Sequence, residues 1–247
     1  SGFTDFDKLV SGLNPSALIV VGGRPSMGKS TLVQNIALHV ALEQKKTVAF
    51  FSLETSRQEL GERLACMLAG VNPKGFRSGM LSRQEAEKLL AAAGRIAETG
   101  LFIDDSMLSP PEMKVRARRL MQERGLDLVI VDYLQMIQGK TGRSEYRQQD
   151  VAEISRSMKV MAKDLRVPVI AVSQLSRETE KRGRGSKPQL ADLRESGAIE
   201  QDADVVAFVH RDEYYEPEND NVKGLAELIV RKNRNGPTGT VSLTFRG

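Results

Sequence analysis

The chain has 247 residues, of which 40% are hydrophobic and 28% charged, a balance that predicts one globular domain with a sizeable core. Its single cysteine, Cys66, excludes an internal disulfide and a cysteine-based zinc cluster, and its net charge of +4 permits an anionic partner without requiring one. No stretch approaches the roughly eighteen apolar residues of a membrane span, and the first residues lack the basic and apolar regions of a signal peptide. We therefore expect no membrane association and a cytoplasmic location.

Short apolar runs alternate with longer helical patterns along the chain, which predicts an α/β fold with a mainly parallel central sheet flanked by helices. After a lead-in segment, the predicted strands occupy residues 17–21, 47–52, 101–103, 128–131, 168–172 and 204–209. Most of them are nearly continuous apolar runs, as expected for strands that are buried on both faces.

Local signals predict several of the intervening helices. Ser82 with Glu85, and Ser109 with Glu112, have the spacing of a capping box, in which both side chains bind backbone N–H groups at the start of a helix. Over residues 146–165, apolar side chains recur at steps of three and four, so this segment is predicted to be a helix with one face packed on the sheet.

The last part of the chain changes character. Residues 226–231 and 241–245 have strand patterns, and the segment between them contains Asn235-Gly236. An Asn-Gly pair between two strands is a strong signal for a β-hairpin. The sequence contains no internal repeat and no long linker, so we predict one domain over residues 1–247, with residues 1–16 leading into it.

Residues 23–30 form a complete phosphate-binding pattern, Gly-x4-Gly-Lys-Ser, between a predicted strand and a predicted helix. In such a loop the backbone N–H groups surround the phosphates, the lysine reaches the β- and γ-phosphates, and the hydroxyl of Ser30 binds Mg²⁺. We therefore expect ATP and Mg²⁺ as cofactors. The predicted nucleotide-binding residues are Gly23, Arg24, Pro25, Ser26, Met27, Gly28, Lys29, Ser30 and Thr31.

Three other predicted strands end in polar residues that suit the same site. Asp132 follows the apolar run 128–131, as a second magnesium ligand would in a Walker B strand. Glu54 follows the run 47–52 and is the candidate general base for the attacking water; the alternative is a charge that stabilises the start of the next helix. Gln174 can accept from water and donate to a γ-phosphate, so it is a candidate sensor of that phosphate.

Taken together, these motifs resemble the RecA-like P-loop ATPases, and more closely the C-terminal domain of DnaB-type replicative DNA helicases. The resemblance covers essentially the whole chain. The segments that carry it are residues 4–7, 24–30, 51–54, 131–135, 173–175, 192–197, 199–204 and 232–236.

This resemblance implies an ATP-driven motor that forms a homohexameric ring, with nucleotide at each subunit interface and single-stranded DNA through the centre. It implies that Glu54 is the catalytic glutamate, that Gln174 is the sensor, and that Lys232 and Arg234 reach the γ-phosphate of a neighbouring subunit. Strand geometry agrees, because residues i and i+2 of a strand project to the same face and can converge on one anion.

Two basic segments are candidates for DNA contact. Arg182 and Arg184 belong to a basic, glycine-containing stretch after the sensor strand; the alternative is an ordinary solvated loop. Arg194, Glu195 and Gly197 match the segment that holds the DNA backbone in the family. Neither segment contains an aromatic residue, so binding is expected to depend on salt and hardly on base sequence.

Helicases of this type also carry an N-terminal domain and a linker helix, which this sequence lacks, and their full-length forms work with a primase and a loader in the replisome. Two alternatives stay open at this point. One is a RadA-like or KaiC-like ATPase of the same superfamily, although RadA-type proteins usually have Phe at the position of Asn235. The other is a nucleotide-gated binding module without useful turnover, against which the presence of Glu54 and Gln174 argues.

Overall fold

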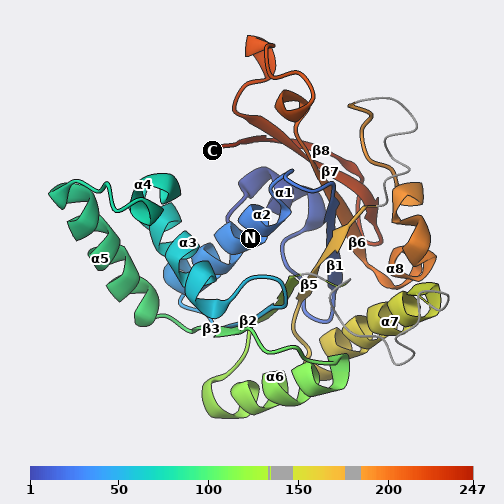
Figure 1. Cartoon of the computed structure of the whole chain (residues 1–247). Coiled ribbons are helices and arrows are strands. Elements are labelled where there is room, and N and C mark those ends of the chain that lie inside the picture. Colours follow the sequence, from blue (N-terminus) through green and yellow to red (C-terminus); the bar gives the residue numbers. More distant parts are fainter. Residues whose placement is uncertain (133, 135–146, 176–184, 247) are drawn as a thin grey trace.

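The computed structural model describes residues 1–132, 134, 147–175 and 185–246, and for residues 147–149 and 194–197 it describes only the backbone. These residues form a twisted sheet with helices on both faces (Figure 1). The order of the strands across the sheet is β3-β2-β4-β5-β1-β6-β7-β8. Neighbouring strands from β3 to β6 run parallel, and β7 and β8 continue the sheet antiparallel to β6. The strands are β1 (Leu18–Gly23), β2 (Val48–Ser52), β3 (Leu101–Asp104), β4 (Leu128–Asp132), β5 (Val169–Gln174), β6 (Val205–His210), β7 (Leu225–Asn233) and β8 (Gly239–Thr244).

The helices connect these strands and cover the sheet. The α-helices are α1 (Thr4–Val10), α2 (Lys29–Leu38), α3 (Arg57–Ala69), α4 (Pro73–Arg77), α5 (Arg83–Ala97), α6 (Pro110–Arg124), α7 (Arg147–Leu165) and α8 (Gly197–Asp202). A π-helical turn, η1 (His39–Glu43), extends α2, and 3-10 turns occur at η5 (Leu190–Ser196), η6 (Asp212–Tyr214) and η7 (Asp220–Val222).

The two faces of the sheet belong to two separate cores, because alternate residues of each strand point to opposite sides. On one face, Val20 and Val131 pack with residues of α6 and α7, among them Met158. On the other face, Val21 and Ile130 pack with residues of α1, α2 and α3. A strand in this position must be apolar at every residue, which explains the continuous apolar runs.

The expected fold is confirmed. Every predicted strand is present within one or two residues, both capping boxes form, and residues 147–165 are helical with a buried apolar face. The strand β3 is only partly buried because it lies at the edge of the sheet. The short helix α1 was not predicted. In the described parts of the chain, no helix is both long and apolar enough to cross a membrane.

The hairpin also forms, but its first strand is longer than predicted. Strand β7 runs to Asn233, so Lys232 lies within the strand while Arg234 lies just after it. The simple argument from i and i+2 strand geometry therefore does not apply to Arg234.

Candidate nucleotide site and subunit-interface residues

The phosphate loop connects the end of β1 to the start of α2. Gly28 is the N-cap of α2 and has φ 97°, a left-handed conformation that favours glycine. A Cβ atom at Gly28 would lie 2.9 Å from the ring of Phe245, and a Cβ atom at Gly23 would lie 3.0 Å from the carbonyl oxygen of Val209. Close packing thus disfavours a side chain at both ends of the loop, and at Gly28 the backbone conformation also favours glycine.

Lys29 lies beneath this loop. Its Nζ donates to the carbonyl oxygen of Arg24 at 2.9 Å, which ties the ammonium group to the loop backbone. Burial lowers the pKa of Lys29 to about 8, while the nearby carboxylates of Asp132 and Glu54 act in the opposite direction. An anion bound in the loop would stabilise the charged form of the lysine and raise this pKa.

Asp132 ends β4 and is 7% exposed. Burial raises the pKa of this carboxyl group; a hydrogen bond from the Ser30 side chain opposes the shift, and the negative charge of Glu54 adds to it. Its Oδ1 is buried without a hydrogen-bond partner among the described residues. A hydroxyl group and an unpaired buried carboxylate oxygen side by side fit a magnesium ion that takes its remaining ligands from phosphate and water.

Glu54 is placed beside Asp132 by the pairing of β2 with β4. Ser52 is in register with Asp132, and the Leu53 N–H donates to the Asp132 carbonyl oxygen at 2.8 Å. The Glu54 side chain is exposed at this edge of the sheet. Helix α3 starts later, and its N-cap is Ser56, whose side chain accepts from the Glu59 N–H. The alternative role of Glu54, a charge that stabilises the start of this helix, is therefore less favoured, because Ser56 already caps it.

Gln174 ends β5 at the same edge. It is in register with Gly23, and the Leu175 N–H donates to the Gly23 carbonyl oxygen at 3.3 Å. The carboxyl ends of β1, β2, β4 and β5 therefore bring together the phosphate loop, Glu54, Asp132 and Gln174. This edge is where ligands bind in open α/β sheets.

Two residues that sequence reasoning missed pack against the loop. The Arg211 guanidinium lies 3.6 Å from the ring centroid of Phe245 and approaches the Ser26 carbonyl oxygen at 3.4 Å. Arg211 also donates to Glu213 at 2.8 Å. Neither Arg211 nor Phe245 belongs to a recognisable motif. The only signal in the sequence is their position: Arg211 lies two residues after the predicted strand 204–209, and Phe245 is the last residue of the predicted strand 241–245.

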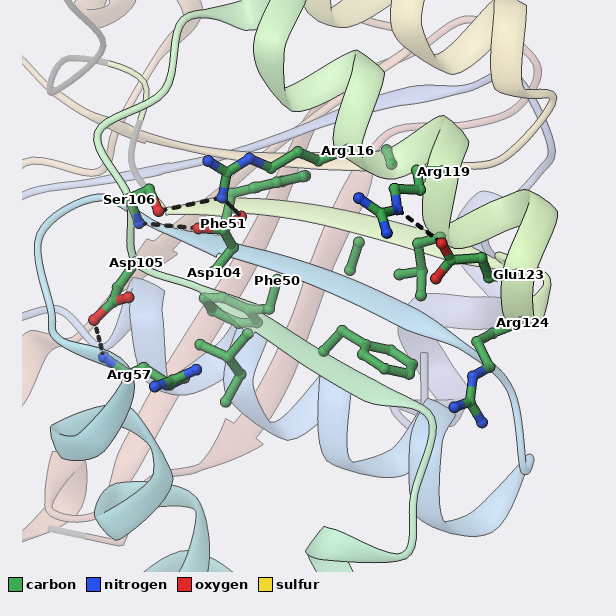
Figure 2. Close-up of a pocket in the computed structure, with 15 residues that line it drawn as sticks. Phe50, Phe51, Arg57, Asp104, Asp105, Ser106, Arg116, Arg119, Glu123 and Arg124 are labelled. Atoms are coloured by element: carbon green, nitrogen blue, oxygen red, sulfur yellow. Dashed lines mark hydrogen bonds and ion pairs between the residues drawn. The ribbon is translucent and has the colours of Figure 1, made fainter.

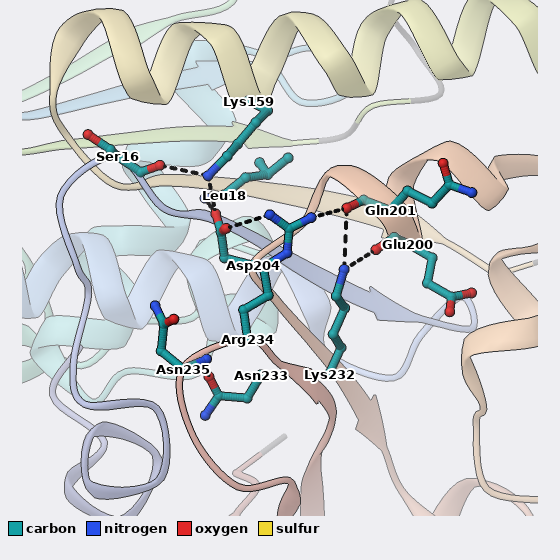
Figure 3. A network of polar contacts seen from close by, with 10 residues as sticks. All are labelled: Ser16, Leu18, Lys159, Glu200, Gln201, Asp204, Lys232, Asn233, Arg234 and Asn235. Atoms are coloured by element: carbon teal, nitrogen blue, oxygen red, sulfur yellow. Dashed lines mark hydrogen bonds and ion pairs between the residues drawn. The ribbon is translucent and has the colours of Figure 1, made fainter.

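Lys232 and Arg234, here called the finger pair, lie at the edge of the sheet where β1 begins, opposite to the phosphate loop. Figure 3 shows their contacts. Lys232 Nζ donates to the carbonyl oxygens of Glu200 at 2.5 Å and Gln201 at 3.3 Å, and Arg234 also donates to the Gln201 carbonyl oxygen. The two cations therefore converge, although Arg234 lies outside the strand. Burial, and secondarily the charge of Arg234, lowers the pKa of Lys232.

The finger pair cannot reach the phosphate loop of its own chain. Arg234 contacts Asp204, which accepts from the Leu18 N–H at the first residue of β1. The loop begins at Gly23, the last residue of β1, and the five strand steps of about 3.3 Å from Leu18 to Gly23 span roughly 16 Å. Only a second copy of the chain can bring a finger pair to this loop.

The predicted DNA segments are described only in part. Arg182 and Arg184 lie outside the described residues. Arg194 and Glu195 fall within η5, and Gly197 is the first residue of α8. The described end of the basic stretch contains Lys187, which forms an ion pair with Glu227.

A cavity of about 720 Å³ lies away from the nucleotide site, between the edge strand β3 and helix α6 (Figure 2). It contains Arg116 and Arg119, which are paired with Asp104 and Glu123. No residue of the phosphate loop lines it. We do not assign it to the nucleotide.

The parallel sheet, the phosphate loop and the carboxylates at its edge define a RecA-like P-loop nucleotide-binding domain. Residues 1–247 match the DnaB-like helicase C terminal domain family. The chain belongs to this family.

Relatives and solved structures agree with this assignment. The chain is 47% identical to the replicative DNA helicase DnaB of Geobacillus stearothermophilus and 46% identical to the replicative DNA helicase DnaC of Bacillus subtilis, in each case over 99% of the chain and 54% of the relative. It thus spans about half the length of these relatives. A DnaB-like replicative helicase, solved in a study of its interactions with primase, superposes with a TM-score of 0.93 at 34% identity, covering 100% of this chain and 59% of that one. A separately solved ATPase domain gives a TM-score of 0.92 at 34% identity, covering 99% of this chain and 86% of that one.

Proposed function

We propose that this chain is the motor domain of a replicative DNA helicase, which hydrolyses ATP at the subunit interfaces of a homohexameric ring to move along single-stranded DNA and unwind the duplex. The observation that carries the proposal is the separation of the phosphate loop from the finger pair. The phosphate loop lies at one end of β1 and the finger pair at the other. In a ring of identical subunits, the loop of one subunit meets the finger pair of the next.

Each group at the interface then has a distinct task. The loop backbone and Lys29 bind the β- and γ-phosphates, and Ser30 and Asp132 hold Mg²⁺, which neutralises phosphate charge when it is bound. Glu54 orients the attacking water and accepts its proton. Gln174 contacts the γ-phosphate, and Lys232 and Arg234 of the neighbouring subunit stabilise the negative charge of the transition state.

Single-stranded DNA is the proposed track, held by Arg194, Glu195 and Gly197 and by the basic residues Arg182 and Arg184. The family assignment supports this proposal. Primase is a proposed partner of the full-length protein, since a similar helicase has been studied for its interactions with primase. A helicase loader is proposed on the same family grounds.

Steady-state ATPase activity of the full-length protein, with and without single-stranded DNA, tests the proposal. Loss of an arginine finger typically lowers turnover by roughly 10³–10⁵-fold, so Arg234→Ala is expected to bind nucleotide normally and hydrolyse it very slowly. Glu54→Gln should behave in the same way because it lacks the base.

Arg231→Ala is the matched control, since Arg231 is an exposed arginine near the end of β7, three residues before Arg234. Normal turnover in Arg234→Ala would rule out the trans finger. Turnover that single-stranded DNA does not change at low salt would favour a binding module over a motor.

A further inference from the structure

A largely buried carboxylate lies beside the finger pair. Asp204 immediately precedes β6, and its side chain is 14% exposed. Its Oδ2 accepts from the Leu18 N–H at 2.7 Å and from Lys159 Nζ at 2.5 Å, while its Oδ1 lies 3.5 Å from Nη1 of Arg234 (Figure 3). The Asp204 carbonyl oxygen also accepts from the Arg234 N–H at 2.9 Å. This residue therefore holds both the backbone and the side chain of Arg234.

Asp204 is itself held firmly from the other side. Lys159 comes from α7 and is 17% exposed, and its Nζ donates a second bond to the Ser16 carbonyl oxygen at 3.0 Å. The carboxylate is thus fixed to β1 through Leu18 and to α7 through Lys159. Arg234, by contrast, is 46% exposed and depends on its contacts for a defined orientation.

The contacts to Asp204 differ in strength. Lys159 occupies one carboxylate oxygen at short range, which partly neutralises the group, and Arg234 approaches the other oxygen at the long end of hydrogen-bonding distance. The Arg234 guanidinium also donates to the Gln201 carbonyl oxygen, so Asp204 adds a longer, charged contact to that bond.

We propose that Asp204 is the positioning residue of the trans finger, Arg234. Lys159 partly neutralises the Asp204 carboxylate and so limits the strength of its contact with Arg234. The inference rests on the proposed role of Arg234 at a neighbouring phosphate. Asp204 does not touch the nucleotide; it orients Arg234 at the base of the hairpin, so that the guanidinium group points to the γ-phosphate of the adjacent subunit when the ring forms.

The first test is the kinetics of Asp204→Asn in the full-length protein. Asparagine keeps an acceptor for the Leu18 N–H but loses the charge that orients Arg234. We expect kcat to fall at least about tenfold while KM for ATP changes less than about twofold, because the phosphate loop lies at the far end of β1.

Asp127→Asn is the matched control. Asp127 accepts from the Thr47 N–H at 2.9 Å and pairs with Lys46 at 3.2 Å just before β2, so it has the same structural task without a finger nearby. Its kcat should be unchanged. An equal loss of kcat in both variants, or no loss in Asp204→Asn, would overturn the proposal.

A mixing experiment separates positioning in trans from damage to the same subunit. Asp204→Asn subunits keep Glu54, and Glu54→Gln subunits keep a positioned finger, so a mixed ring contains interfaces with two intact halves. We expect single-turnover hydrolysis to reappear in the mixture although each variant alone is slow.

Arg234→Ala mixed with Glu54→Gln serves as the reference for this experiment. Recovery in the reference but not with Asp204→Asn would overturn the positioning role and leave the trans finger intact. No recovery in the reference would overturn the trans finger, and the positioning role with it.

Discussion

Lys29 illustrates how a single residue prepares the site for an anion. Folding buries its ammonium group, which lowers the pKa, and the charges of Asp132 and Glu54 offset this effect only in part. The pKa of Lys29 is therefore about 8. Triphosphate binding favours the charged form and raises that pKa. The phosphate loop therefore binds its ligand together with the proton on Lys29.

This linkage predicts a pH dependence of nucleotide affinity. The lysine of the free protein is charged below pH 8, so affinity is fully present there and is lost as the pH rises through about 8 toward the ordinary value of 10.5. Affinity for a fluorescent ATP analogue should fall by up to about tenfold per pH unit in this window. The weaker binding of Lys29→Met should lack this slope, and an equal slope in that variant would show that another group titrates.

Gly28 shows how the packing of a neighbour restricts a loop residue. Its φ of 97° and the nearby Phe245 ring both oppose a side chain. Gly28→Ala should therefore destabilise the protein by about 1–3 kcal/mol and weaken nucleotide binding, as measured by urea unfolding and by titration.

Gly12→Ala is the control for this prediction. Gly12 has φ 78° but nothing within 4 Å of an added Cβ atom, so it isolates the backbone contribution. Equal costs in the two variants, with nucleotide binding retained in Gly28→Ala, would show that the Phe245 contact is unimportant.

At the scale of elements, the hairpin that carries the finger pair is anchored to α1. Asn233 Nδ2 donates to the carbonyl oxygens of Leu9 and Pro237, each at 3.1 Å, and its Oδ1 accepts from the Asn235 N–H at 3.3 Å. One side chain thus joins the end of β7, the turn and the last part of α1.

Asn233→Ala should therefore lower the free energy of unfolding by roughly 1–3 kcal/mol, because two carbonyl groups and one N–H lose their partner. It should also slow ATP turnover by disturbing the adjacent Arg234. Asn219→Ala removes the same group from the N-cap of the exposed turn η7, so it should lower the free energy of unfolding by less and leave turnover unchanged. Turnover equal to that of the unmodified protein would show that the hairpin keeps its position without this anchor.

At the scale of the whole molecule, β1 separates the phosphate loop from the finger pair. The phosphate loop follows its last residue, and the finger pair is held near its first residue through Asp204. The rigid, fully buried strand keeps the two groups apart, so hydrolysis should require contact between copies.

This separation predicts that nucleotide binding by the 247-residue domain does not depend on protein concentration, whereas hydrolysis occurs only when copies of the domain associate. Specific ATPase activity should rise with protein concentration in the micromolar range and approach zero on dilution, while nucleotide affinity per chain stays constant. Specific activity that is independent of concentration, measured alongside a monomeric mass by light scattering, would contradict a shared site.

The sequence by itself was sufficient for the strands, the phosphate loop and the carboxylates at the edge of the sheet. Each depends on short-range patterns: an apolar run, a glycine-rich motif of eight residues, or a polar residue directly after a strand. Strands buried on both faces have few acceptable sequences, and parallel strands bring their carboxyl ends to one edge, so the cluster of Glu54, Asp132 and Gln174 follows from their positions alone.

Only the tertiary structure decided how groups distant in sequence meet. The stacking of Arg211 on Phe245 beside the phosphate loop, and the contacts of Lys159, Asp204 and Arg234, depend on the order of strands across the sheet and on the bulge between β6 and β7. No local pattern encodes that order, because it results from the packing of the whole sheet against two layers of helices. The same packing places the finger pair at the opposite end of β1 from the loop, which is the separation on which the proposed shared site rests.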